Sequence, residues 1–415
     1  MCAWRGPEVR DKAAEISYRL ARIFLLVLAA VMPLAAVTAA REIALVGTAL
    51  FGAAWLVLGR VRPRATALGW AVGAFALASA LSVVTAVDRS YSLGELRAET
   101  LKGLICFFAA ANLIRRPEHV RQLWSVLLVM AGIMGLGGVV LFFADGGRTP
   151  TIAMRASSLH YGYGAFATYL ATMWPLVLVG LWWVREKRAR AGLWAVVFLT
   201  LVSAYLTISR GCWLAMVVES ALIGIGLARR RKRVAMAVAA GALAVVVILG
   251  ALPGARHGER LGMLLKDPAK VGGTLGDLIS VWSFSLKQIA AHPFTGIGVG
   301  RHSFSKAFPE FRATHQPLLW HAHNMWLDVA LQMGVQGVVA LGWVFVAGFR
   351  RLWPRVAPGR GQMVGLFCLG VAVMLVGFGV RNLTDDFFAD DSALMLWLLL
   401  GAGMAAREVG EEQGL

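Results

Sequence analysis

Charged residues are scarce in this sequence: they make up 15% of its 415 residues, whereas 58% are hydrophobic. A chain this apolar is not an ordinary water-soluble globular protein. Apolar runs of about 20 residues recur along it, and each is long enough to cross a hydrocarbon core roughly 30 Å thick. The composition therefore predicts an all-α polytopic membrane protein.

Cysteine and acidic residues are also few. No two of Cys2, Cys106, Cys212 and Cys368 have metal-binding or redox spacing, which argues against a zinc site or a disulfide framework. Lys and Arg outnumber Asp and Glu by 41 to 23. In a soluble chain this excess would suggest a nucleic-acid partner, but in a membrane protein its distribution among the loops matters more. We expect no nucleic-acid partner and no cofactor.

The apolar runs predict about twelve membrane-spanning helices. The first run starts near Ile23 behind a basic segment and lacks a clear cleavage site, so we expect a retained helix and not a removed signal peptide. The expected spans are 23–40, 43–59, 65–86, 100–114, 122–143, 164–184, 191–208, 211–228, 233–252, 323–348, 361–380 and 391–406.

Alternate loops are strongly basic. The loops at 60–64, 115–121, 185–190, 229–233 and 350–360 hold 19 basic residues against only Glu118 and Glu186. Basic loops stay in the cytoplasm, so both termini are expected there. The other loops then face the periplasm of a bacterial inner membrane. We expect a transmembrane bundle at 1–252, a long periplasmic loop at 253–322, and further transmembrane helices with a short cytoplasmic tail at 323–415.

Two arginines stand at the expected outer face of the first bundle. Arg155 lies in a loop rich in Gly and Tyr, and it suits either a lipid headgroup or a functional role. Arg210 lies in the short turn at 207–213 between two apolar spans. A guanidinium at a membrane edge needs an anion or the interface to accept it, and we favour a functional role for Arg210 over a lipid contact.

The long loop carries an expected amphipathic helix at 277–292, followed by a glycine-rich segment at 292–300. No strand precedes these glycines and the spacing of a nucleotide-binding loop is missing, so a tight turn is expected. Further basic residues follow, among them Arg301 and Arg312, and the loop ends in His321-Ala322-His323-Asn324.

The two histidines suggest acid–base chemistry, because a histidine takes up a proton near neutral pH. The alternative is a pair of inactive surface histidines followed by Asn324 as a helix cap. On a regular helix, residues two apart point in different directions, so we expect no metal pair from them. The last outward loop holds Arg381 and four aspartates, including Asp385 and Asp386. Four carboxylates can hold a divalent cation, but pairing with arginine is the favoured interpretation, and no metal site is expected.

Together these residues predict a cavity at the outer membrane face that binds phosphate. Arginine recognises phosphate through paired N–H groups, which suits a polyprenyl pyrophosphate substrate open to both lipid and water. The expected rim consists of Arg155, Arg210, Arg301, Arg312 and Arg381, with His321 and His323 nearby.

At this point the chain resembles the bacterial O-antigen ligases and the wider ligase/polymerase superfamily of envelope glycan enzymes. The resemblance rests on Ser209-Arg210-Gly211, on HPFTGIGVGRHSF at 292–304 and on HAHNMWLDVALQMGVQG at 321–337. It covers the second half of the chain, and the first half matches mainly in topology.

The resemblance implies a GT-C-like, metal-independent, inverting glycosyltransferase. It would transfer a glycan from undecaprenyl pyrophosphate to a sugar of lipid A–core. By the same implication Arg210 binds the donor pyrophosphate and His323, or as second choice His321, deprotonates the acceptor. Relatives have an arginine shortly before the tryptophan of the surface helix. Here the segment 277–282 has none, so Arg301, Arg312 or Lys287 would take its place.

Other functions share these features. A polymerase of glycan repeats or a protein O-oligosaccharyltransferase would use the same donor and base with a different acceptor. A transporter of lipid-linked glycans is a further alternative, but transporters carry ionisable residues in mid-span and internal repeats. Charges here collect at the expected span ends, which favours an enzyme.

Overall fold

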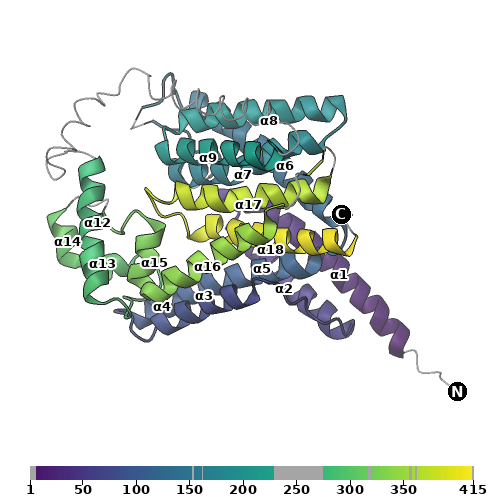
Figure 1. Ribbon diagram of the computed structural model, residues 1–415, viewed down its shortest axis with the longest axis horizontal. Helices are drawn as coiled ribbons and strands as arrows, with labels where there is room; N and C mark the ends of the chain where they lie inside the picture. The colour runs from purple at the N-terminus through teal and green to yellow at the C-terminus, as the bar shows by residue number, and fades with distance from the viewer. Residues whose placement is uncertain are drawn as a thin grey trace.

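The computed structural model describes residues 6–151, 154–160, 162–228, 274–315, 319–354, 358–359 and 362–413. The regular elements in these ranges are helices. Figure 1 shows most of the long helices running in one common direction as a bundle, whereas α12 (Thr274–Ala291) runs across one end of it.

Within the described residues, eight helices are long and apolar enough to cross a membrane. This confirms a polytopic all-α membrane protein. The eight are Ala35–Leu58, Pro117–Ala144, Tyr163–Trp183, Lys187–Leu206, Arg210–Leu227, Val335–Leu352, Met363–Arg381 and Asp390–Glu412. The span expected at 233–252 lies outside the described residues.

The N-terminal helices differ from the predicted boundaries. α1 covers Gly6–Val31, a one-turn helix η1 follows at Ala35–Val37, and α2 covers Thr38–Leu58. The sequence analysis placed a single span across 23–40. The chain turns at Pro33, because proline has no backbone N–H and disfavours helical geometry in the residue before it.

The next helices bring the chain back and forth across the bundle. α3 (Gly69–Ser82) is followed by a continuous helix made of α4 (Arg89–Glu95), the π-helical turn η2 (Leu96–Leu101) and α5 (Lys102–Leu113). Asp88 caps α4 by accepting a hydrogen bond from the Tyr91 backbone N–H. The four helices after it are α6 (Pro117–Ala144), α7 (Tyr163–Trp183), α8 (Lys187–Leu206) and α9 (Arg210–Ala228).

The centre of the bundle is formed by α7, α17 (Met363–Arg381) and α18 (Asp390–Glu412), which are the most deeply buried of the candidate spans. The sequence predicts a two-residue connection between α8 and α9. The structure has three residues there, because α8 ends at Leu206 and α9 begins at Arg210. The loop at 382–389, described below, joins two of these central helices, α17 and α18.

One carboxylate interrupts the apolar interior. Glu219 in α9 is fully buried, and neither of its carboxylate oxygens has a hydrogen-bond partner among the described residues. It faces α17, where a Cβ on Gly377 would lie 1.6 Å from the Glu219 Oε1 atom. The expectation that charges collect only at span ends is therefore wrong at this position, and the sequence argument against a transporter is correspondingly weaker.

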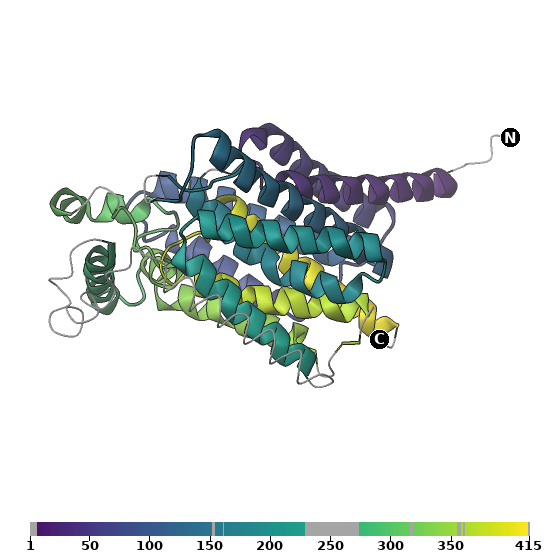
Figure 2. The same ribbon diagram turned by 90° about the horizontal axis from the view of Figure 1, so that it is seen from above.

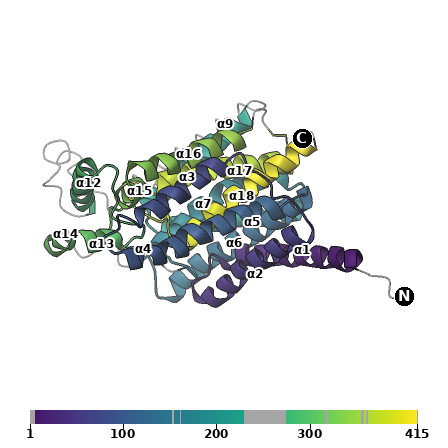
Figure 3. The ribbon, with the colours of Figure 1, turned by 90° about the horizontal axis from the view of Figure 1, so that it is seen from below.

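A second, smaller apolar cluster lies outside the bundle. It joins α12, α13 (Ser303–Ala307), α14 (Pro309–Thr314) and α15 (Met325–Met333) through the buried side chains of Val281, Phe304, Phe311, Leu319 and Leu331. The predicted amphipathic helix at 277–292 is confirmed as α12. Figures 2 and 3 show α12–α14 at one end of the bundle and the first turns of α1 at the other.

The span predicted at 323–348 is two helices, α15 and α16 (Val335–Leu352), separated at Gly334. Gly334 has φ +76°, a conformation that glycine adopts without steric cost and that breaks helical geometry. The nine residues of α15 therefore form a separate short helix that carries the histidine segment at its N-terminus.

The glycine-rich segment at 292–300 packs against the C-terminal end of α15. The Ile297 and Gly298 backbone N–H groups donate to the Leu331 and Gln332 carbonyls, at 2.9 and 3.1 Å. These carbonyls belong to the last turn of a helix, which lacks internal partners. A Cβ on Gly296 would lie 2.0 Å from the Gln332 oxygen, so only glycine fits this contact. The segment is thus a turn that caps the C-terminal end of α15. The sequence predicted the turn but not the cap.

Candidate active site

The histidine segment is a non-helical turn before α15. His323 has φ +48°, a region that histidine visits more often than most residues. Asn324 then caps α15 by accepting hydrogen bonds from the Trp326 and Leu327 backbone N–H groups. The helix cap predicted as the alternative role of Asn324 is therefore present, and the two histidines lie just before it in the chain.

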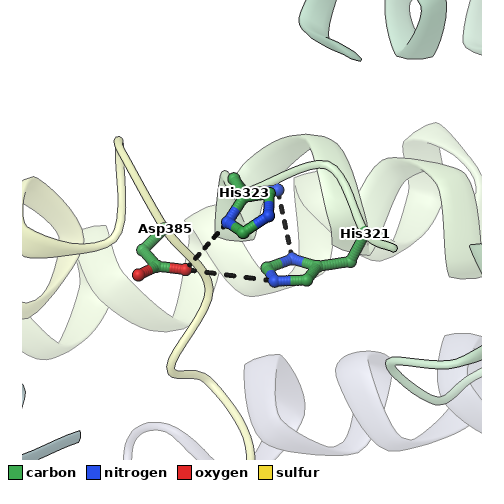
Figure 4. Close-up of side chains that lie close together, drawn as sticks. All are labelled: His321, His323 and Asp385. Carbon is green, nitrogen blue, oxygen red and sulfur yellow. Dashed lines mark hydrogen bonds and ion pairs between the residues drawn. The ribbon is translucent and has the colours of Figure 1, made fainter. Parts of the chain in front are cut away.

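His321 and His323 lie side by side, with ring centroids 3.9 Å apart. Figure 4 shows both rings facing the carboxylate of Asp385. The expectation that the two rings would point in different directions was wrong, because it assumed helical geometry at residues that form a turn. The His323 Nδ1 atom lies 3.2 Å from the Asp385 Oδ1 atom, and the His321 Nε2 atom lies 4.0 Å from the same oxygen.

His321 is held from its other side by α15. Its Nδ1 atom lies 3.1 Å from the Asp328 Oδ2 atom, and the other oxygen of Asp328 accepts from the Ala322 backbone N–H at 2.9 Å. The His321 side chain is only 2% exposed, whereas that of His323 is 21% exposed. A substrate hydroxyl can therefore reach His323 more readily than His321.

Asp385 belongs to the loop between α17 and α18, and this loop is joined to the histidine segment by hydrogen bonds. The Met325 backbone N–H donates to the Asn382 carbonyl at 3.0 Å. The Asn324 side-chain amide donates to the Leu383 carbonyl, also at 3.0 Å. These bonds fix the carboxylate of Asp385 relative to His323.

The two adjacent aspartates have opposite protonation behaviour. Burial alone would raise the pKa of Asp385, but the hydrogen bond with His323 and the charge of Arg381 outweigh burial and hold it well below its usual range. Burial, followed by repulsion from Asp328, raises the pKa of Asp386 to about 6. Asp385 is therefore an anion at neutral pH and can orient and stabilise a protonated His323.

Two of the predicted arginines lie close to this loop. Arg210 is exposed at the first residue of α9. A Cβ on the next residue, Gly211, would lie 2.9 Å from the Thr384 hydroxyl and 3.3 Å from the Arg381 carbonyl, so α9 begins directly against the Asp385 loop. The buried Arg381 donates to the Gly164 carbonyl at 3.2 Å, and one of its terminal nitrogens lies 4.0 Å from Asp385.

Two other arginines contact aromatic rings. Arg155 stands over Tyr163 at 4.3 Å from the ring centroid. Arg301 lies over Trp320 at 5.0 Å and donates to the Asp386 carbonyl at 2.6 Å. The Nε atoms of Arg155, Arg301 and Arg381 are buried and lack hydrogen-bond partners among the described residues. Arg312 belongs to α14, and its side chain lies outside what the structure describes.

A cavity of about 580 Å³ opens beside Asp385. Among the predicted rim arginines whose side chains the structure describes, Arg301 lines it, whereas Arg155, Arg210 and Arg381 do not. The remaining walls come from the N-terminal end of α2, the first turn of α7 and the start of α18, with Arg41, Tyr163 and Asp391 among their residues. Arg41 and Asp391 form a buried ion pair.

Sequence reasoning missed Arg41 and Tyr163 as site residues. Arg41 is 350 residues from its partner in the chain, and no local pattern connects the two positions. The only signal was an arginine between the first two apolar runs. Asp328 was also missed, although its place seven residues after His321 in the same segment could have suggested a contact.

The histidine and aspartate atoms are also close enough to hold a metal ion. One ligand atom each from His321, His323 and Asp385 lie within 4.8 Å of one another. The prediction that the two histidines do not form a metal pair thus loses its geometric basis. Activity with and without a chelator tests whether this group of side chains uses a metal.

Residues 195–342 match the family described as O-antigen ligase. The matched segment includes α9 with Arg210, the helices α12–α14 and the histidine segment. It therefore covers the residues on which the resemblance is based. The match covers 148 of the 415 residues, so it shows a similarity to this family in that part of the chain. No curated protein matches the chain.

Proposed function

Because the segment that carries Arg210 and His323 matches the O-antigen ligase family, we propose that this protein is an O-antigen ligase. It transfers a glycan from undecaprenyl pyrophosphate to a sugar hydroxyl of lipid A–core, in lipopolysaccharide biosynthesis. The observation that carries the proposal is the partly exposed imidazole of His323, hydrogen-bonded to the Asp385 carboxylate in a loop that lies against the start of α9 and follows Arg381.

The proposed step is a single displacement with inversion. The acceptor hydroxyl gives its proton to His323 while its oxygen forms a bond to the anomeric carbon of the donor sugar. The bond between that carbon and the pyrophosphate oxygen breaks, and undecaprenyl pyrophosphate leaves with the bonding electrons. Asp385 stabilises the positive charge that His323 acquires, which is the role of a carboxylate behind a general base.

The arginines supply positive charge where the pyrophosphate leaves. Arg210 is exposed and has no recorded ion-pair partner among the described residues, and Arg155, Arg301 and Arg381 each keep a buried Nε–H unpaired. Arg155 and Arg301 are held by aromatic rings and a carbonyl, and not by carboxylates, so they remain available to an anion. Arg381 also pairs with the Asp385 carboxylate at 4.0 Å. We assign donor binding to Arg210 first, with Arg155, Arg301, Arg312 and Arg381 in support.

The proposed site faces the periplasm. In this orientation the basic loops and both termini lie in the cytoplasm, in accord with the excess of Lys and Arg in those loops. α12–α14 and the histidine segment then lie at the opposite end of the bundle (Figure 1). A GT-C-like arrangement, with the site at the outer end of a helical bundle in the inner membrane, accommodates a substrate that lies partly in lipid.

The test is a transfer assay with purified protein in liposomes. The protein is incubated with undecaprenyl-pyrophosphate glycan and lipid A–core, with and without EDTA, and the products are separated on a gel. Glycan-bearing lipid A–core formed in EDTA is the expected result. Activity lost in EDTA and restored by a divalent cation would instead assign a metal to His321, His323 and Asp385.

Two other products identify the alternatives. Donor glycans that lengthen without reaching lipid A–core would identify a polymerase, and glycan attached to protein would identify a protein O-oligosaccharyltransferase. Movement of intact donor across the liposome membrane with no covalent product would identify a transporter, in which case the mid-span Glu219 becomes the first residue to replace.

A further inference from the structure

The cavity beside Asp385 differs in charge from a pyrophosphate site. Its lining includes two arginines, Arg41 and Arg301, against three aspartates, Asp385, Asp390 and Asp391. A site for a multiply charged anion needs an excess of cations. The formal charges of this lining therefore favour a neutral ligand over a pyrophosphate.

The arginines with unpaired Nε–H groups lie mostly outside this cavity. Arg155 contacts the ring of Tyr163, and Arg381 donates to the carbonyl of Gly164. Tyr163 and Gly164 line the cavity, but Arg155 and Arg381 do not. The first turn of α7 therefore contacts both the cavity and these two arginines, and Arg381 also lies over the cavity-lining ring of Phe387, at 4.8 Å from its centroid.

One wall of the cavity is polar, but its two charged side chains neutralise each other. Arg41 and Asp391 are 9% and 5% exposed and pair with each other. Beside them, burial followed by the charge of Arg41 lowers the pKa of His160 to about 4, so this imidazole is uncharged at neutral pH. Together with the Thr38 and Ser392 hydroxyls, the wall offers oriented donors and acceptors without net charge.

Two aromatic rings complete the cavity. Tyr163 is 46% exposed, and Phe387 is partly exposed in the loop that carries Asp385. Fixed carboxylates and hydroxyls suit the hydroxyl groups of a sugar, and aromatic rings suit the apolar faces of its ring. The volume falls within the roughly 300–1,000 Å³ that small-molecule sites occupy.

We propose that this cavity is a pyranose-binding subsite, with the Arg41–Asp391 pair as its hydrogen-bonding wall and Tyr163 as its stacking wall. The assignment rests on the proposed glycosyl transfer, because it places the bound sugar next to the Asp385–His323 pair. The pyranose belongs either to the donor glycan, next to its pyrophosphate, or to the acceptor core. Both share the chemistry that the cavity recognises, and the pyrophosphate lies outside it, toward Arg155, Arg210 and Arg381.

The experiment measures binding of sugar apart from turnover. Full-length protein in nanodiscs is studied by saturation-transfer NMR with two lipid-free probes, the deacylated core oligosaccharide and the glycan released from the donor. Undecaprenyl pyrophosphate without sugar is the third probe, measured by competition with the donor. Tyr163→Leu removes the stacking ring without opening a buried ion pair, and Asp391→Asn removes the carboxylate while keeping its size.

Phe294→Leu is the matched control. Phe294 is 74% exposed in the outer glycine-rich segment, it does not line the cavity, and its replacement also exchanges an aromatic ring for leucine. We expect this control to bind all three probes as the wild type does.

The expected result is about fivefold weaker binding of one oligosaccharide by Tyr163→Leu and by Asp391→Asn. The oligosaccharide that is affected identifies the source of the pyranose. Asp391→Asn should bind undecaprenyl pyrophosphate as the wild type does, and any loss in Tyr163→Leu should match that of Arg155→Ala, because the Tyr163 ring holds Arg155. Equal weakening of undecaprenyl pyrophosphate and sugar in Asp391→Asn would show a phosphate site and overturn the proposal, as would unchanged sugar binding or a wild type that binds neither oligosaccharide. Failure of the proposed function appears separately, as absent transfer by a wild type that still binds sugar.

Discussion

The His323 Nδ1 atom lies 3.2 Å from the Asp385 Oδ1 atom, although 62 residues separate the two positions in the chain. Between them run α15, α16 and α17, which leave the outer face and return to it. The proposed general base and the carboxylate behind it thus come from two different loops, and each variant of the pair tests a different part of the proposed mechanism.

Replacing His323 with alanine should reduce transfer by about 10²–10⁴-fold, because the acceptor hydroxyl loses its proton acceptor. Binding of the donor should remain, since Arg210 and the other arginines are unchanged. The measurement combines transfer rates in liposomes with donor binding. His315→Ala is the control, because His315 is exposed directly after α14 and is not part of the group formed by His321, His323 and Asp385. Near-normal transfer by His323→Ala would remove this residue as the base and leave His321.

Replacing Asp385 with asparagine should change the pH dependence of transfer. The low pKa of Asp385 makes it an anion throughout the neutral range, and an anion next to His323 favours the protonated imidazole. Without it, we expect the acidic limb of the pH–rate profile to move to lower pH and the plateau rate to fall, because the base is weaker. A variant with the same acidic limb as the wild type would show that Asp385 only supports the loop.

Replacing Arg210 with alanine should weaken donor binding by about 10–100-fold, the value of one charge-assisted hydrogen bond of roughly 1.5–3 kcal/mol. The acceptor KM should stay unchanged. Arg148→Ala is a matched control, because Arg148 is an exposed arginine of the preceding outward loop. Equal loss in both variants would indicate general attraction of an anionic lipid surface instead of a specific contact.

Asp386 makes a prediction about stability. Its pKa of about 6 in the folded protein exceeds the ordinary unfolded value near 3.9. Between about pH 4 and 6 the folded state therefore binds more protons than the unfolded state, and stability should fall as pH rises through this window. Asp386→Asn should remove this decrease, on the order of 2 kcal/mol. Thermal unfolding near pH 4.5 and pH 6.5 compares the two proteins, and an unchanged pH response in the variant would contradict the assignment.

The sequence predicted the fold class and singled out the two polar segments that meet at the candidate site, because both depend on local signals. Apolar runs identify membrane helices by length, and α12 followed from the helical spacing of its apolar residues. The histidine segment and the aspartate loop each stood out as polar groups at the ends of apolar spans. The sequence pattern does not predict that these two segments lie side by side. The hydrogen bonds that join them, from Met325 and Asn324 to the aspartate loop, link residues that are far apart in the chain.

The errors arose where one backbone conformation decides the direction of the chain. Gly334 divides a continuous apolar pattern into two helices, and apolar periodicity does not register a single residue with positive φ. The orientation of the two imidazoles depends in the same way on His323. The Arg41–Asp391 pair was missed for a different reason: its members lie at opposite ends of the sequence, and only packing brings them together.

The break at Gly334 also allows α16 to move without moving α15 and the candidate site at its N-terminus. A helix that spans a membrane tilts when the thickness of the lipid changes, and α16 is such a helix. α15 is joined to the end of α17 by the Met325–Asn382 hydrogen bond and is capped by the glycine-rich turn, so tilting of α16 can be taken up at the hinge after Met333. The separation of His323 and Asp385 therefore depends on how α15 packs on the end of α17, and not on the direction in which α16 crosses the bundle.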